Sequence, residues 1–147
     1  MICNISQVRF RSLIALLAFL TVQSAVAGST PAVSGTYAVV KKTSLGSQEQ
    51  IQMRIHLVNN GSSALSILRM TLWDLSQPLR GGTRSWAAEL AGRASVDTVQ
   101  EFTIPRLHYQ MWEKGMSPSL VLQLAGPGKA KTKTVVRLNR VSAQEVK

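Results

Sequence analysis

Cysteine and histidine are scarce in this chain, and each shortage excludes a class of function. Cys3 is the only cysteine among 147 residues, and it lies in a leader that we expect to be removed. The mature chain then has no thiol, which excludes disulfides, cysteine catalysis and thiolate metal sites. His56 and His108 are the only histidines, and neither has a second histidine or an acid at ligand spacing. A metal site needs three or four converging ligands, so we interpret both as structural or solvated and predict no metal or cofactor.

Local motifs of nucleophilic catalysis and phosphate binding are also missing. No serine lies in a G-x-S-x-G or S-x-x-K motif. Gly81-Gly82 lacks the Lys-Ser/Thr pair that follows the glycines of a phosphate-binding loop. We therefore predict no catalytic residues and a protein that is not an enzyme. The alternative is an enzyme with an unrecognised site in the stretch 74–92.

The N-terminal residues have the order of a secretory signal peptide. Residues 1–12 carry Arg9 and Arg11 and no acid, and the apolar run Leu13–Val22 follows. Ala25-Val26-Ala27 then gives the small-x-small pattern of a cleavage site. Ten apolar residues are too few for a membrane span, which needs about 20, so no transmembrane segment is predicted in the mature chain. We expect an exported protein, in the periplasm or outside the cell, with a retained anchor as the alternative.

Acidic residues are few, and the mature chain is strongly basic. Removal of residues 1–27 leaves 15 Lys and Arg against seven acids, a net charge of +8. In a cytoplasmic protein such an excess favours nucleic acid as the partner. Export disfavours nucleic acid and favours an anionic envelope polymer or an anionic lipid surface. Charge that serves only solubility is the alternative.

Alternating apolar and polar residues predict strands along most of the mature chain. The clearest case is Ile51–Leu57, where every second residue is apolar. Asn59-Asn60-Gly61 and the apolar run Ala64–Trp73 follow, and together they predict a β-hairpin. The run changes parity near Ile67–Leu68, which predicts a bulge. Trp73 would then face outward, either as a ligand-contacting aromatic or under a neighbouring loop. Further strands are predicted at 35–43, 94–104, 119–124 and 131–141.

Two stretches do not alternate. Pro105–Gly115 starts with proline and ends with glycine, which predicts a short helix. Its predicted apolar side is Leu107, His108, Met111 and Trp112. Asp74–Gly92 contains several turn residues and is interpreted as a long irregular loop. The number and spacing of the strands favour an antiparallel β-sandwich with one short helix. The predicted layout is a signal peptide at 1–27, a flexible lead-in at 28–34, the sandwich domain at 35–141 and a tail at 142–147.

The segment IHLVNNGSSALSI and the closing pair PSLVLQL and TVVRLNRV resemble bacterial immunoglobulin-like and fibronectin-type-III-like modules. That resemblance implies an immunoglobulin-like fold that serves adhesion, spacing or carbohydrate contact. The chain departs from the pattern because it lacks a core cysteine pair and contains the helix-like PRLHYQMWEKG. We expect an exported, non-enzymatic module that contacts a protein or a polyanion in the cell envelope. An assembly or chaperone-like subunit that accepts a partner's strand at an exposed edge is the alternative.

The last predicted strand provides the candidate site. Four cationic residues in and just before this strand share one parity, so they lie on the same face, and the opposite face carries Thr and apolar residues. This row is the predicted polyanion contact. The alternative is edge protection, because lysines on an exposed strand discourage aggregation. The residues of the row are Lys129, Lys131, Lys133 and Arg137.

Overall fold

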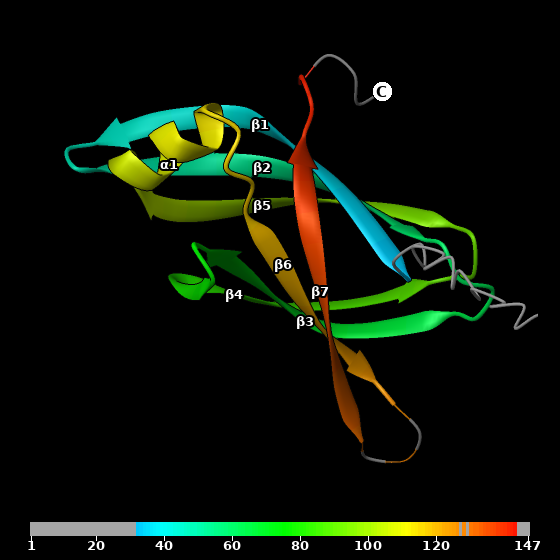
Figure 1. The fold of residues 1–147 in the computed structure, drawn as a ribbon. Helices are drawn as coiled ribbons and strands as arrows, with labels where there is room; N and C mark the ends of the chain where they lie inside the picture. The colour runs from blue at the N-terminus through cyan, green and yellow to red at the C-terminus, as the bar shows by residue number, and fades with distance from the viewer. Residues whose placement is uncertain (1–31, 127, 129, 144–147) are drawn as a thin grey trace, which may run out of the picture.

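A computed structural model describes residues 32–126, 128 and 130–143, and this part of the chain holds seven strands and one helix (Figure 1). Strand β1 begins at Val33, two residues before the predicted start of the domain. The predicted signal peptide lies outside the described residues. The elements are β1 (Val33–Leu45), β2 (Gln48–Asn59), β3 (Leu65–Asp74), β4 (Gln77–Leu90), β5 (Ser95–Pro105), α1 (Arg106–Glu113), β6 (Ser119–Ala125) and β7 (Lys131–Arg140).

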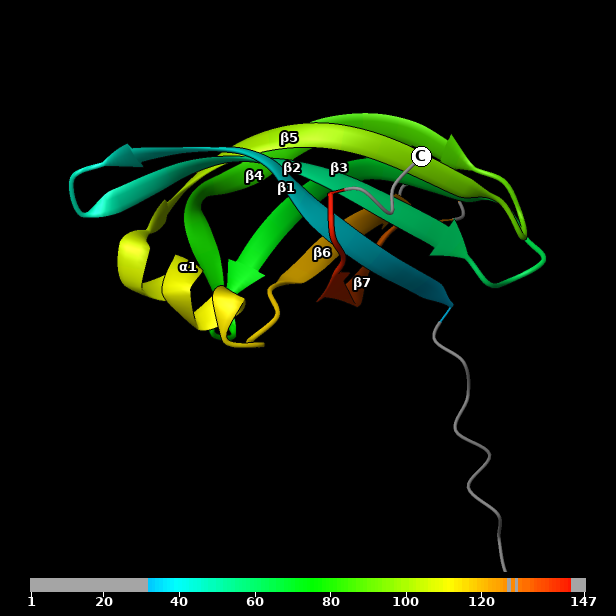
Figure 2. The ribbon, with the colours of Figure 1, turned by 90° about the horizontal axis from the view of Figure 1, so that it is seen from above.

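The strands form one mixed sheet in the order β4-β3-β6-β7-β1-β2-β5. All neighbours are antiparallel except β1 and β7, which run parallel and pair over Gly35–Tyr37 and Leu138–Arg140. The sheet rolls up and is nearly closed as a barrel, because its two end strands approach each other (Figure 2). At that approach the Arg84 guanidinium on β4 lies 5.0 Å from the centre of the Phe102 ring on β5. The predicted all-β class is confirmed, while an immunoglobulin-like arrangement of two antiparallel sheets is not.

Strand β2 shows why the sheet holds together. Its apolar residues Ile51, Met53, Ile55 and Leu57 are completely buried, and the residues between them are half-buried. This confirms the predicted alternation. The buried face of β2 packs with inward residues of the other strands into one apolar core. Burial of an aliphatic side chain contributes about 1.5–3 kcal/mol, so the core is the main source of stability in a chain without disulfides.

The predicted hairpin between β2 and β3 is wrong. β2 pairs with β1 and β5, whereas β3 pairs with β4 and β6. The Asn59–Gly61 segment instead carries the chain from one half of the sheet to the other. The buried Asn59 amide nitrogen lies 2.8–3.2 Å from three backbone carbonyl oxygens, those of Ser63, Leu90 and Ala91, and its Oδ1 accepts the Gly61 N–H. Asn59 therefore joins the β2–β3 and β4–β5 connections, a role that turn propensity does not reveal.

The predicted loop at Asp74–Gly92 is also wrong, because most of it is strand β4. β4 pairs with β3 on both sides of an irregularity at residues 79–82, which contains its two glycines and where Gly81 has φ +68°. Such irregularities let a strand keep its pairing while it contains residues that otherwise mark turns. The predicted bulge in β3 is confirmed, since its pairing with both β4 and β6 shifts register between Ile67 and Arg69.

Helix α1 connects β5 to β6, as predicted for Pro105–Gly115, and it buries Trp112 as predicted, but Tyr109 in place of Leu107. Tyr109 and Trp112 point into the core, and the Trp112 ring meets Tyr37 edge to face at 6.0 Å. Leu107, predicted on the apolar side, is 65% exposed. Aromatic rings bury the largest apolar areas, so the pair Tyr109 and Trp112 decides which side of the helix faces inward.

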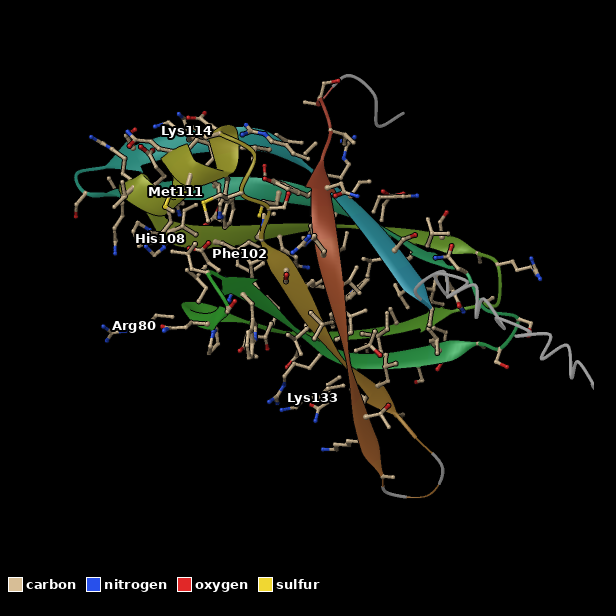
Figure 3. All side chains as sticks on the ribbon, viewed as in Figure 1. Arg80, Phe102, His108, Met111, Lys114 and Lys133 are labelled. Carbon is tan, nitrogen blue, oxygen red and sulfur yellow. The ribbon has the colours of Figure 1, made fainter. Side chains whose placement is uncertain are left out.

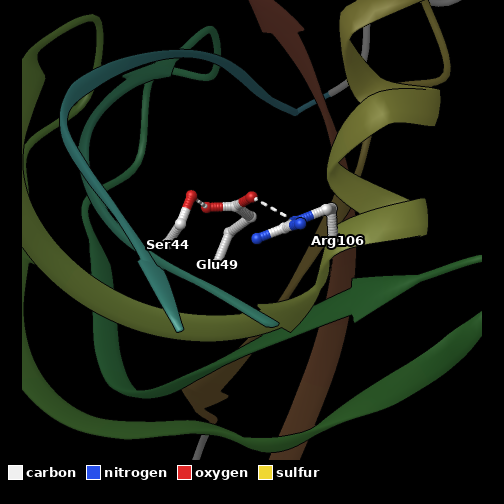
Figure 4. A network of polar contacts seen from close by, with 3 residues as sticks. All are labelled: Ser44, Glu49 and Arg106. Atoms are coloured by element: carbon white, nitrogen blue, oxygen red, sulfur yellow. Dashed lines mark hydrogen bonds and ion pairs between the residues drawn. The ribbon is translucent and has the colours of Figure 1, made fainter. Parts of the chain in front are cut away.

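The start of α1 is fixed by a polar network at the β1–β2 turn (Figure 4). The buried Glu49 carboxylate accepts a hydrogen bond of 2.7 Å from Ser44 Oγ and one of 2.9 Å from Arg106 Nε. The Ser44 hydrogen bond, together with Arg106, lowers the pKa of Glu49 below its ordinary value. The Arg106 backbone N–H also donates to the Ser47 carbonyl. The network therefore attaches the helix to the hairpin that it covers.

Within the described residues, no helix has the length and apolar character that crossing a membrane requires.

Candidate functional site

Strands β3, β6 and β7 lie side by side and share one exposed face, which we call the outer face. Their register aligns residues in rows across the three strands. One row is Arg69, Gln123 and Lys133, and another is Trp73, Ser119 and Arg137. Neighbouring strands are about 4.8 Å apart, so each row spans about 10 Å from β3 to β7. The outer face is therefore a continuous surface rather than the face of a single strand.

The outer face carries most of its charge on β7. Lys131, Lys133 and Arg137 are exposed, while Val136 and Leu138 on the opposite side are buried. Lys133 lies toward the β6–β7 turn, well away from Lys114 at the C-terminal end of α1 (Figure 3). Lys129 lies outside the described residues. The strand register places one more cation on this face, Arg69 on β3, which was not part of the predicted row. We call the following set the outer cations: Arg69, Lys131, Lys133 and Arg137.

Acidic residues do not neutralise the outer cations. β6 and β7 contain no Asp or Glu, and the one acid of β3, Asp74, is buried. Most other acids have local partners: Glu49 binds Arg106, Asp97 lies 3.1 Å from His56, and Glu101 accepts from Gln50. Within the described part of the chain, the outer cations have no hydrogen-bond or ion-pair partner. The face therefore presents uncompensated positive charge to solvent.

Most of β7 also has one open edge. β7 pairs with β6 from Lys131 to Arg137, but with β1 only from Leu138 to Arg140. Among the described residues, no strand covers the other edge of the Lys131–Arg137 segment. The lysines of this segment can therefore protect an edge as well as bind a ligand.

A groove of about 680 Å³ lies at one end of the outer face. The row Trp73, Ser119 and Arg137 lines it, with Trp73 and Arg137 on either side of the small Ser119. We call it the Trp73 groove. Its volume is within the range of about 300–1,000 Å³ that is usual for small-molecule sites. Its other lining residues come from the β3–β4 turn, the segment after α1 and β7: Asp74, Leu75, Ser76, Gly115, Met116, Ser117, Val135 and Asn139.

A buried carboxylate lies beneath the β3–β4 turn. Asp74 Oδ1 accepts a 2.8 Å hydrogen bond from Trp112 Nε1, and Asp74 Oδ2 pairs with His108 Nδ1. His108 and Trp112 are one helical turn apart, so both reach Asp74 from the same side of α1. The turn places Leu75 and Ser76 at φ +46° and +66°, a region that non-glycine residues seldom adopt. The contacts of Asp74 therefore hold a strained turn against the helix.

Asp74 also borders a second groove, of about 580 Å³, on the side of His108 and Arg80 (Figure 3). An Asp–His pair is one component of a nucleophilic site, but such a site also needs a nucleophile within hydrogen-bond reach of the imidazole. The lining of this groove includes Thr103 and no serine. The described residues hold no group of three or more His, Cys, Asp or Glu side chains placed to bind a metal. We therefore assign the Asp74 cluster to the positioning of the turn.

Comparisons with known proteins give only distant likenesses. No family model matches the chain, and no curated protein sequence does. The ycdA protein of Bacillus subtilis, described as a candidate lipoprotein, is similar over 71% of this chain with 14% identity and a TM-score of 0.37. The chain spans about a third (34%) of that protein. A protein from Archaeoglobus fulgidus is similar over 71% of this chain and 90% of its own length, with 10% identity and a TM-score of 0.32.

Proposed function

We propose that this chain is an exported, non-enzymatic module that binds an anionic polymer of the cell envelope along its outer face. The observation that carries the proposal is the set of outer cations, which share one surface and have no acidic partner there. An extended polyanion can meet several of these charges at once. The signal-peptide pattern at residues 1–27 supports export.

Such binding is electrostatic, and its physics makes it measurable. Charges exposed to water are screened within about 8 Å at physiological ionic strength, so retention on an anionic polymer must fall steeply with salt. Strand geometry places Lys131 and Lys133 about 6.7 Å apart on the same face, which lets one polymer contact both. We expect Lys131 and Lys133 to add affinity with little specificity, because they provide charge rather than a shaped cavity.

The test is a pair of variants with equal loss of charge. Lys131→Gln with Lys133→Gln removes two outer cations, whereas Lys41→Gln with Lys114→Gln removes two exposed lysines elsewhere. On an immobilised heparin or lipopolysaccharide column, the first variant should elute at clearly lower salt and the second should stay close to the wild type. Equal shifts in both variants would mean that only the net charge matters and would overturn the proposal.

A second candidate function follows from the open edge of β7, where a partner's strand can add to the sheet. Strand addition uses backbone hydrogen bonds, so it tolerates Gln at positions 131 and 133 and depends little on salt. In that case the column retention of the double variant should not change. Increased light scattering by this variant, with unchanged retention, would assign the lysines to edge protection.

A further inference from the structure

We propose that the Trp73 groove is a subsite for one acidic sugar residue of the bound polymer, with the ring on Trp73 and the carboxylate on Arg137. The inference rests on the proposed function and adds the class of ligand. It begins from the row Trp73, Ser119 and Arg137, which crosses β3, β6 and β7. Two strand spacings separate the backbones at Trp73 and Arg137 by about 10 Å. Ser119 between them is small, so it leaves the space between the two larger side chains open.

The chemistry of the two walls is complementary to an acidic pyranose. An indole ring offers an apolar face that suits the C–H groups on one side of a sugar ring. A guanidinium offers paired N–H donors that match the two oxygens of a carboxylate. Arg137 is exposed and has no ion-pair partner among the described residues, so its donors are available to a ligand.

The remaining lining favours a sugar over a lipid. Short polar side chains can hydrogen-bond to ring hydroxyls, and four of them surround the space: Ser76, Ser117, Ser119 and Asn139. The carboxylate of Asp74, which also borders the groove, is engaged by Trp112 and His108. Exposed apolar residues are present as well, namely Leu75, Met116 and Val135. They lie among these polar groups, whereas an acyl chain requires a continuous apolar lining.

The position of the groove connects it to the rest of the outer face. Arg137 belongs both to the groove and to the outer cations. Lys133 is four residues away on the same strand face, a distance of about 13 Å along β7. A polymer with one residue in the groove can therefore continue along β7 over Lys133 and Lys131. The groove would fix the position of the polymer, and the lysines would add affinity that depends on salt.

The direct experiment titrates the chain with a glucuronic-acid-containing hyaluronan tetrasaccharide, and with neutral chitotetraose as the matched ligand. Calorimetry and tryptophan fluorescence report binding at low ionic strength. We expect only the acidic ligand to bind. Trp73→Leu should weaken it by about 2- to 12-fold, and Arg137→Gln by about tenfold or more. Lys41→Gln, which removes an equal charge from β1 away from the outer face, should leave tetrasaccharide binding unchanged. Thermal melts verify that each variant is folded, and Trp73→Phe should retain most of the affinity if the Leu variant unfolds.

The outcomes separate the subsite from the proposed function. Polymer retention that depends on Lys131 and Lys133, with no tetrasaccharide binding or none that depends on Trp73, overturns the subsite and leaves the proposed function in place. Tetrasaccharide binding that depends on Trp73 and Arg137, with polymer retention that ignores the two lysines, supports the subsite and overturns the polymer path along β7. Binding of anionic phospholipid vesicles, lost on Leu75→Ser with Met116→Ser and without any sugar binding, overturns the assignment to a sugar.

Discussion

Asn59 offers the sharpest test of how the two halves of the sheet are joined. Its side chain is buried and contacts carbonyl oxygens in both the β2–β3 and the β4–β5 connections. The amide has two N–H donors, so at most two of its three short contacts are full hydrogen bonds, and Oδ1 accepts a further bond from Gly61. Three hydrogen bonds at about 0.5–1.5 kcal/mol each predict that Asn59→Ala lowers the free energy of unfolding by about 2–4 kcal/mol.

Asn59→Asp separates this explanation from a simple loss of volume. Aspartate has nearly the same shape but no donor, and it brings a negative charge toward carbonyl oxygens. We therefore expect it to destabilise the protein at least as much as alanine does. Urea denaturation followed by tryptophan fluorescence gives the midpoints and slopes, with Gln52→Ala on the wet side of β2 as a control that should change stability by less than about 0.5 kcal/mol. A tolerated aspartate, or a loss below about 0.5 kcal/mol for alanine, would refute this account of Asn59.

Three further predictions concern the core and the charged groups. Ile55 is completely buried in β2, so Ile55→Ala should lower the free energy of unfolding by about 2–5 kcal/mol in the same urea assay. Burial raises the pKa of Tyr37 to about 12, so the unfolded chain loses this proton first as the pH rises above 10. Relative to Tyr37→Phe, the wild type should lose about 2.3 kcal/mol of unfolding free energy by pH 12, which urea melts at each pH measure. The pKa of Glu49 is lowered by the Ser44 hydrogen bond and by Arg106. The contribution of the Glu49 carboxylate to stability is therefore present above the ordinary carboxyl pKa and is lost as acid protonates the group in the folded state. Ser44→Ala should make this loss of stability in acid smaller, as urea melts across the acidic range would show.

The strands with one wet and one buried face could be predicted from the sequence. Alternation in β2 and β6 follows directly from burial on one side, and the parity change at Ile67–Leu68 marks a real bulge. β4 could not be predicted because Pro78, Gly81 and Gly82 are residues that usually mark turns. A strand can hold such residues near an end or at an irregularity when a neighbour maintains the pairing, and that neighbour is not visible in the local sequence.

Pairing partners, by contrast, depend on contacts between distant segments. Asn59-Asn60-Gly61 has the composition of a tight hairpin, yet the Asn59 side chain bonds to the Leu90 and Ala91 carbonyls instead. The cationic row on β7 could be predicted because its spacing lies within one strand. Arg69 and the Trp73 groove could not, because only the register of β3 with β6 and β7 brings them onto the same face.

The place of β7 in the sheet has a consequence for the order of folding. Among the described strands, β7 is the last in sequence but the fourth of seven in the sheet, between β6 and β1 (Figure 1). Without it the ladder divides into β4-β3-β6 and β1-β2-β5, which share no paired strand. A chain that is still being synthesised, or one that has lost its C-terminal residues, can form two three-stranded pieces but cannot complete the sheet. Completion of the sheet therefore requires that the chain has been made through β7, and a truncation before Lys131 should leave both pieces open to proteolysis.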